Sequence, residues 1–233
     1  MTSDGNTQTP APVITIDGPS GSGKGTLTVM VAQALGWHTL DSGALYRIVG
    51  VACERSGIPL EAEREEDIAK RARELNITFS PQGAVVDGEP YEDAIRTEEG
   101  GAAASKVAAM PQVRLAVHDL QLKARRVPGL VADGRDMGTF VFPDAELKVF
   151  LDASAEERAE RRYKQLKNKG LSVSLPALLE QIRERDARDT GRTVAPLKPA
   201  EDALIIDSTS MSIEAVFDQV MEAASERGFA PSA

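Results

Sequence analysis

The chain has 233 residues, 42% of them hydrophobic, which suits one large α/β domain with an insertion around a packed core. No apolar run approaches the roughly 18 residues that a bilayer span requires, so we expect no membrane partner. The net charge of −9 argues against nucleic acid as a partner, because that affinity depends on positive charge. If the ligands are anions, the positive charge that binds them must be local.

The two ends of the chain are predicted to be tails. Residues 1–12 are polar and contain prolines, without the basic segment and apolar stretch of a secretion signal. We therefore expect a flexible N-terminal tail on a cytoplasmic protein, and a second tail over residues 229–233. The one cysteine, Cys53, lies on the apolar face of a predicted helix, so we expect a buried thiol and no disulfide within the chain.

The first predicted elements surround a phosphate-binding loop. Residues 13–16 form an apolar run typical of a strand, and apolar residues at helical spacing follow over residues 27–35. In the glycine-rich segment between them the backbone can curl until N–H groups point at an anion, and the positive end of the helix favours the same charge. Lys24 would reach the β- and γ-phosphates of a nucleotide. We expect nucleotide contacts from Gly18, Pro19, Ser20, Gly21, Ser22, Gly23, Lys24, Gly25 and Thr26.

This loop departs at one position from the common pattern G-x-x-x-x-G-K-[ST]. Gly25 follows the lysine, and the hydroxyl comes one residue later, at Thr26. The departure weakens the expectation of a hydroxyl ligand to Mg²⁺ and favours a metal held largely by phosphates and water. Thr26 and Asp133 are the candidate metal contacts.

A second anion site is predicted after the next strand. Residues 37–40 are an extended run, and a helical pattern covers residues 45–53. Either Asp41 or Ser42 would cap that helix. Arg47 lies beside its apolar stripe, which leaves two interpretations: a capped helix with solvated polar residues, or a loop that holds a second anionic ligand together with Arg47.

The middle of the chain predicts an antiparallel insertion. A charged helical segment over residues 61–75 precedes it. Three short extended runs follow, separated by strong turn signals, at residues 77–79, 84–86 and 91–95. Helical patterns then return over residues 97–109 and 113–124.

The loop after the next strand carries charged residues. Residues 130–132 predict a buried parallel strand, and ligands of such sheets bind beyond the carboxyl ends of the strands. Asp133 stands at that end, where a carboxylate could orient the water shell of a metal. Arg135 and Asp136 follow, as ligand-binding residues or as a surface ion pair of little energetic value.

The last part of the chain alternates strands and helices. Residues 147–151 predict a strand, and residues 154–157 form a capping box that opens a helix ending near Gly170. A further helix leads into the charged run 183–192. By composition that run is a solvated face, but the glycine and prolines that follow favour a mobile flap rich in arginine. A last strand over residues 204–207 and a closing helix over residues 213–224 complete the pattern.

Four segments in order resemble the bacterial cytidylate kinases, within the nucleoside monophosphate kinase family. They are residues 18–26, 40–47, 133–139 and 185–192, with the sequences GPSGSGKGT, LDSGALYR, DGRDMGT and RDARDTGR. The antiparallel insertion near residues 77–96 is similar to one that such enzymes carry, and the resemblance covers residues 13–228. It implies an α/β P-loop kinase with a five-stranded parallel sheet flanked by helices, a small antiparallel insertion and an arginine-rich lid.

The resemblance also implies a function. A single kinase domain over residues 13–228, with a monophosphate-binding insertion at about 60–110 and a lid at about 170–200, would move the γ-phosphoryl group of ATP to CMP or dCMP. The products would be ADP and CDP or dCDP, with Mg²⁺ as cofactor and a monomer as the expected state. The partners would be the small-molecule nucleotides ATP, CMP and dCMP.

The family's site residues carry over by position. Some resemble residues that read the cytosine edge, namely Ser105, Arg114 and Asp136. Others resemble residues that hold the α-phosphate of the acceptor, namely Arg47, Arg135 and Arg192, with Ser42 in the same pocket. Arg185 and Asp189 resemble residues that meet the ribose. Either Arg161 or Arg162 would lie against the adenine of ATP. The catalytic set would be Lys24, Arg135, Arg185 and Arg192.

Two other functions remain open from the residues. One is another small-acceptor kinase, acting on UMP or on a non-nucleotide acceptor. If no pyrimidine edge is read, Ser105, Arg114 and Asp136 have no obvious partner. A nucleotide-regulated switch should carry an Asn-Lys-x-Asp motif. The Asn-Lys pair at residues 168–169 continues as Gly170-Leu171 and lacks the aspartate.

Overall fold

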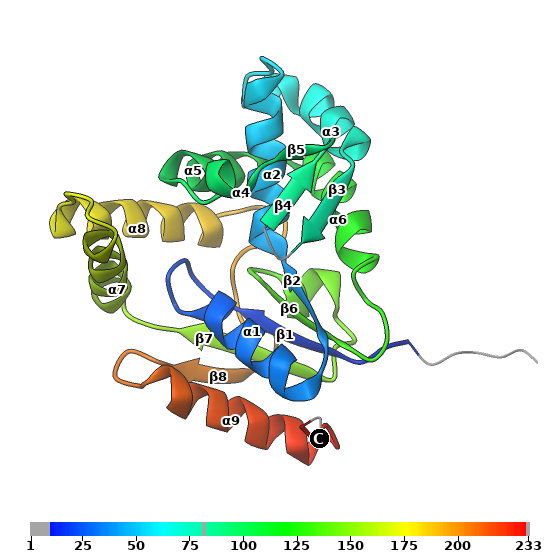
Figure 1. Ribbon diagram of the computed structural model, residues 1–233, viewed down its shortest axis with the longest axis vertical. Coiled ribbons are helices and arrows are strands. Elements are labelled where there is room, and N and C mark those ends of the chain that lie inside the picture. Colours follow the sequence, from blue (N-terminus) through cyan, green and yellow to red (C-terminus); the bar gives the residue numbers. More distant parts are fainter. Residues whose placement is uncertain (1–9, 81–82, 232–233) are drawn as a thin grey trace, which may run out of the picture.

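A five-stranded parallel sheet forms the centre of the computed structural model, which describes residues 10–80 and 83–231 (Figure 1). The strands lie in the order β2-β6-β1-β7-β8, so each neighbour pair needs a crossover through a helix. They are β1 Val13–Asp17, β2 His38–Asp41, β6 Leu130–Gly134, β7 Leu147–Asp152 and β8 Leu204–Asp207. The predicted five-stranded parallel sheet is confirmed.

Helices cover both faces of this sheet. They are α1 Lys24–Leu35, α2 Ser42–Arg55, α3 Glu65–Glu74, α4 Glu92–Ile95, α5 Glu98–Val107, α6 Pro111–Leu122, α7 Ala155–Asn168, α8 Leu175–Thr190 and α9 Ile213–Glu226. Short helical turns also occur at Ala62–Arg64 and Met137–Val141. In Figure 1, α2 to α6 lie above the sheet, α9 lies below it, and α7 and α8 stand together at one end.

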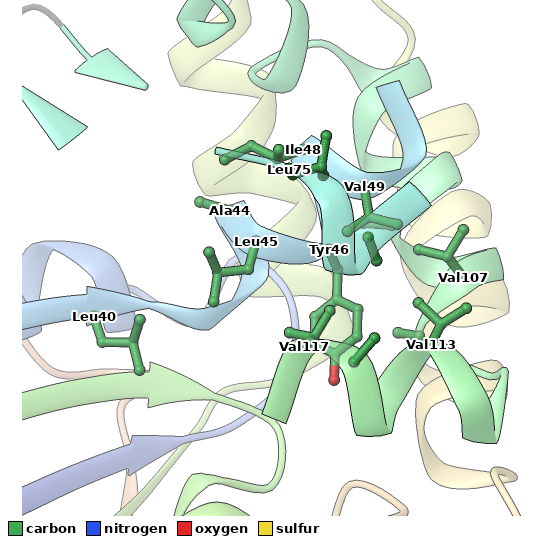
Figure 2. Packing of buried hydrophobic residues seen from close by; sticks show 14 of the residues in the cluster. Leu40, Ala44, Leu45, Tyr46, Ile48, Val49, Leu75, Val107, Val113 and Val117 are labelled. Carbon is green, nitrogen blue, oxygen red and sulfur yellow. The ribbon is translucent and has the colours of Figure 1, made fainter. Parts of the chain in front are cut away.

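Strand residues alternate between two apolar clusters. Ile14 and Ile16 of β1 pack with α1 and α9 on one face, whereas Val13 belongs to the cluster on the other face. That second cluster joins α2, α3, α5 and α6. Figure 2 shows its centre, where Tyr46 of α2 lies among apolar side chains of neighbouring helices. These two layers hold the carboxyl ends of the strands in fixed positions.

The small antiparallel sheet differs in part from the prediction. Strands β3 Ile77–Ser80 and β4 Gly83–Val86 pair as expected, and β5 is only Glu89–Pro90. The expectation of an extended run over residues 91–95 is wrong, because Glu92–Ile95 is the helical turn α4. This turn closes the 2.7 Å contact between Glu92 and Arg96, one helical turn apart, and buries Ile95.

Some residues assigned to the two predicted tails make contacts with the rest of the chain. Residues 1–9 and 232–233 lie outside the described residues, but Ala11 and Pro12 are held by hydrogen bonds of 2.6 Å from Arg125 and 2.9 Å from Leu130. At the other end of the chain, the ring of Phe229 packs edge-on against the ring of Trp37, with 4.9 Å between the ring centroids. Cys53 is buried and free, as predicted.

Candidate functional site

The phosphate loop joins β1 to α1 and depends on glycine. Gly21 and Gly23 adopt φ of +80° and +100°, which side chains other than glycine seldom tolerate. A Cβ atom on Gly18 would lie 2.1 Å from the carbonyl oxygen of Leu151. No side chain caps α1 within the described residues, so its first N–H groups are open to an anion.

Lys24 is buried at the start of α1. Its Nζ donates a hydrogen bond of 2.6 Å to the carbonyl of Pro19 and lies 3.5 Å from Oγ of Ser22. Burial lowers the pKa of Lys24, and the nearby charge of Arg135 lowers it further, against the opposing effect of Asp133. An anion in the loop would offset both of the lowering causes, so the lysine is placed to bind a phosphate.

The two candidate metal ligands, Asp133 and Thr26, differ in burial. Asp133 is buried at the end of β6, opposite Asp41 of β2, and burial and Asp41 raise its pKa. Thr26 is exposed on α1. Over residues 10–80 and 83–231, no group of three or more His, Cys, Asp or Glu side chains could hold a metal ion. The oxygen atoms of Asp133 and Thr26 suit Mg²⁺, but the protein offers too few ligands for a site without phosphates and water.

A cavity beside the loop gathers all of the predicted acceptor-binding residues except Arg47. Its walls come from α2, α5, α6, α8 and the segment after β6. They are Ser42, Gly43, Tyr46, Ala104, Ser105, Ala108, Arg114, Gly134, Arg135, Asp136, Arg185, Asp189 and Arg192. The fold brings these residues together, although the first and the last of them lie 150 residues apart in the sequence.

One wall of the cavity is a buried ion pair between Arg114 and Asp136. Both side chains are only 3% exposed. Arg114 also donates to the carbonyl of Ala108 at 3.3 Å, and its guanidinium lies 5.8 Å and 5.6 Å from the ring centres of Tyr46 and Phe140. Burial raises the pKa of Asp136, and the charge of Arg114 opposes that rise. The pair therefore presents fixed donors and acceptors side by side.

The rest of the charged lining of the cavity carries an excess of positive charge. Asp189 accepts a hydrogen bond of 2.8 Å from Arg135 and also pairs with Arg192. Burial alone would raise the pKa of Asp189, but the charges of Arg135 and Arg192 outweigh this effect, and the pKa is lowered. Burial and then Arg135 lower the pKa of Arg185 to about 10. Three arginines around one carboxylate favour an anionic ligand.

Several buried polar atoms of the cavity have no partner in the part of the chain that the structure describes. They are the hydroxyls of Tyr46 and Ser105 and Nε of Arg114, Arg185 and Arg192. Buried polar groups are rarely left unpaired, because each costs about 1–3 kcal/mol. Atoms of this kind, grouped in one cavity, indicate a polar ligand with several acceptors.

Arg47 lies close to this group without lining the cavity. Its Nη1 donates to the carbonyl of Ile95 at 2.7 Å. A Cβ atom on Gly101 would lie 3.4 Å from Arg185 and 3.6 Å from Arg47, so the two guanidinium groups are near one another. Arg47 thus extends the positive field beyond the cavity wall.

The structure separates the two candidates for the adenine contact. Arg161 donates to the carbonyl of Ser22 in the phosphate loop at 3.3 Å and to Ser208 at 2.6 Å. Arg162 instead pairs with Glu98 of α5, away from the loop. Arg161 is therefore the one of the two that the structure brings to the phosphate loop.

Sequence reasoning missed three buried groups at this site. Tyr46 carries one of the unpartnered hydroxyls, and Gln121 of α6 donates to Oγ of Ser42 at 2.7 Å. Arg158 contacts the phosphate loop at the carbonyl of Ser20. Tyr46 lies in the quoted segment 40–47, next to Arg47, and that was the available signal. Gln121 and Arg158 lie outside the four quoted segments.

Comparisons with known proteins agree on one family. A family model described as cytidylate kinase matches residues 14–226. A protein of Aeromonas hydrophila named cytidylate kinase is 55% identical over 221 residues, which cover 93% of this chain and 95% of the relative. A protein of the same name from Stutzerimonas stutzeri is 55% identical over 227 residues, with coverage of 95% and 98%.

The solved structures support the fold. An uncharacterized protein from Eubacterium ventriosum, 14% identical, aligns with a TM-score of 0.50 over 92% of this chain and 98% of its own. In addition, none of the helices in the described ranges is both long and apolar enough to cross a membrane.

Proposed function

The chain belongs to the cytidylate kinase family, and from this premise we propose that it transfers the γ-phosphoryl group of ATP to CMP or dCMP. The products are ADP and CDP or dCDP. One observation carries the proposal: a cavity with a buried Arg-Asp pair and unpartnered arginine donors lies beside the lysine of a phosphate loop. Arg135 and Arg185 are close enough to Lys24 to affect its pKa, so the two anion sites adjoin.

The Arg114–Asp136 pair matches the edge of cytosine. Cytosine offers an amino group that a carboxylate can accept from, next to ring acceptors that a guanidinium can donate to. Uracil has a carbonyl in place of the amino group and a ring N–H in place of an acceptor, which reverses the pattern. Ser105 completes this subsite with its unpartnered hydroxyl.

The arginines bind and orient the acceptor phosphate. We assign Arg47, Arg135 and Arg192, with Ser42, to the α-phosphate of CMP. Arg185 and Asp189 then lie beside the ribose. A guanidinium group can donate two parallel hydrogen bonds to one phosphate, which fixes the orientation of that phosphate as well as its position. The acceptor oxygen of CMP then points at the γ-phosphate of ATP.

The phosphate loop holds ATP on the other side. Gly18, Ser20, Gly21 and Gly23 supply backbone N–H groups, and Lys24 places its charge against the β- and γ-phosphates. Arg161 is assigned to the adenine side. Asp133 and Thr26 are the residues that would hold Mg²⁺ together with the phosphates, and the ion would supply charge neutralisation when bound.

Transfer then needs positioning and charge rather than covalent participation of the protein. The transition state spreads negative charge over the phosphoryl oxygens, and Lys24, Arg135, Arg185 and Arg192 surround it with cations that are already in place. Water is the competing acceptor. We propose that residues of about 170–200 act as a lid that excludes it, and that the insertion at about 60–110 carries the acceptor side.

We also propose that the enzyme is a monomer of the cytoplasm. Its substrates are small nucleotides, and the anion sites lie within one chain. Size-exclusion chromatography with light scattering measures the state directly.

A coupled assay tests the function. We expect ADP release from ATP and Mg²⁺ only when CMP or dCMP is present, with one CDP or dCDP formed per ADP. Release that needs UMP or a non-nucleotide acceptor would instead identify another small-acceptor kinase. Hydrolysis without any acceptor would identify a nucleotide-regulated switch.

A further inference from the structure

Arg158 of α7 links segments that are far apart in the sequence. Its side chain is only 4% exposed. Nε donates to the carbonyl of Ala153 at 2.9 Å, and Nη1 donates to the carbonyl of Ser20 in the phosphate loop at 3.0 Å. A Cβ atom on Gly21 would lie 3.5 Å from Cβ of Arg158, so the residue lies directly against the loop.

The same guanidinium binds helix α8 through Asp186. The two carboxylate oxygens accept from Nη1 and Nη2 at 3.1 Å and 2.6 Å. Asp186 directly follows Arg185, which lines the acceptor cavity. One helical turn further along, Asp189 holds Arg135.

These contacts form a continuous path from the phosphate loop to the acceptor cavity. It runs from Ser20 through Arg158 and Asp186 to the arginines of α8. Arginine keeps its charge at any working pH and presents a rigid, planar fork, so a shift at one end is transmitted rather than absorbed. Arg158 donates its hydrogen bonds to protein atoms, which suits a residue that positions the phosphate loop and α8 rather than one that binds substrate.

We propose that Arg158 and Asp186 are positioning residues that couple the ATP site to the CMP site. The proposal rests on the proposed function, and it adds that occupancy of the phosphate loop changes the affinity of the acceptor cavity. When phosphates order the loop around Ser20, Arg158 holds Asp186 in register, and α8 presents Arg185 to the acceptor. Coupling of this kind is reciprocal in binding free energy.

Isothermal titration calorimetry tests this on the whole protein. The dissociation constant for CMP is measured alone and with saturating AMP-PNP and Mg²⁺, and the ratio of the two is the coupling. We expect the wild-type protein to bind CMP at least about fivefold more tightly with the analogue. In Asp186→Asn the ratio should fall close to one, because the amide keeps the shape but loses the charge and one acceptor. The affinity for CMP alone should change less than the ratio.

Arg183→Gln is the matched control. Arg183 of α8 pairs with Glu156 of α7 at 2.7 Å, so it joins the same two helices. Both side chains are exposed, at 54% and 61%, and neither contacts the phosphate loop. We expect the coupling ratio of this variant to equal that of the wild type.

The outcomes separate the two proposals. A wild-type ratio of one, a ratio retained in Asp186→Asn, or an equal loss in Arg183→Gln would overturn the positioning role. A wild-type protein that neither binds nor phosphorylates CMP would overturn the proposed function itself. If Asp186→Asn does not fold by circular dichroism, Arg158→Lys replaces it, because lysine keeps the charge but cannot form the fork.

Discussion

The phosphate loop and the acceptor cavity are built in opposite ways. The loop is one short segment, residues 18–26, and the binding proposed for it uses backbone N–H groups and the single side chain of Lys24. The cavity draws on residues from 42 to 192, and the binding proposed for it uses side chains that are already paired with one another, such as Arg114 with Asp136. The loop depends on glycine conformations, whereas the cavity depends on buried charge.

This difference predicts how each region responds to substitution. In the described residues Lys24 hydrogen-bonds to Pro19 and Ser22 and forms no ion pair, so its removal should lower activity while the fold survives. In the cavity, removing one partner leaves the other buried and unpaired, which costs stability as well as binding. Substitutions in the two regions should therefore give different combinations of lost activity and lost stability.

Lys24→Ala should show the effect expected for the loop, a large loss of activity with little loss of stability. We expect kcat to fall on the order of 10⁴-fold, about 5 kcal/mol of transition-state stabilisation, because a preplaced cation is lost. Thermal unfolding should change by only a few degrees. Near-normal turnover in the coupled assay would contradict the role of Lys24.

Arg114→Met should show the cavity's behaviour. The change leaves Asp136 buried without its partner, so we expect a loss of about 3–5 kcal/mol in the free energy of unfolding together with poor use of CMP. ATP binding should be nearly unchanged. Adding Asp136→Asn should restore much of the stability in urea unfolding but not the use of CMP. An unchanged preference for CMP in the single variant would refute the base-reading role.

Asp17 joins the two regions and should give the protein a pH dependence. Its carboxylate, at the end of β1, accepts hydrogen bonds of 2.8 Å from the N–H groups of Met137 and Gly138, which directly follow the cavity residue Asp136. Burial raises the pKa of Asp17 from 3.8 to about 6 in the folded state. Between these values the folded state keeps a proton that the unfolded state has lost, so stability should decline as the pH rises through this window.

The decline attributable to Asp17 should be roughly 3 kcal/mol, at about 1.4 kcal/mol per pKa unit. Urea unfolding of the wild-type protein and of Asp17→Asn at pH 4, 5, 6 and 7 measures it as a difference between two curves. The variant carries no titrating group at this position, so its curve should lack this component. Parallel curves would mean that Asp17 does not carry the effect.

Arg192→Ala should give the smallest effect of the four. Arg192 shares Asp189 with Arg135, so Asp189 keeps one partner when Arg192 is removed. We expect kcat to fall about 30-fold, or about 2 kcal/mol, with little change in thermal stability. Arg188→Ala is the control, since Arg188 lies near the end of α8, four residues before Arg192, and is exposed. Its one ion pair within the described residues is with Glu184, at 4.0 Å. Equal activity in both variants would mean that residues 183–192 form a solvated surface rather than a flap that binds phosphate.

The same contrast explains what could be predicted from the sequence. The strand, the glycine-rich turn and the helix that follows it come from local patterns, and the structure has all three, with α1 beginning at Lys24 rather than after the loop. The cavity residues could be named only through the family resemblance, because Arg114 meets Asp136 across 22 positions and Arg135 meets Asp189 across 54. No local pattern encodes such pairs. Their roles stay predictions until the variants are measured.

Two failures have a physical reason. The run over residues 91–95 was expected to be extended, but Tyr91 and Ile95 lie four residues apart, a spacing that buries both side chains in a strand or in a helix. The contact between Glu92 and Arg96 favours the helical turn. Arg158 was missed because α7 carries several arginines, and only the fold shows which of them reaches the phosphate loop.

In the proposed reaction the phosphate loop and the arginine-lined cavity together bring ATP to a cytosine nucleotide. The most direct measurement is a panel of acceptors, CMP, dCMP, UMP, AMP and shikimate, under one coupled assay with ATP and Mg²⁺. We predict ADP formation that depends on CMP or dCMP, with kcat/KM at least about tenfold higher than for UMP, since a reversed edge leaves buried groups unpaired. Equal rates with every acceptor, or ADP release without any acceptor, would contradict the account.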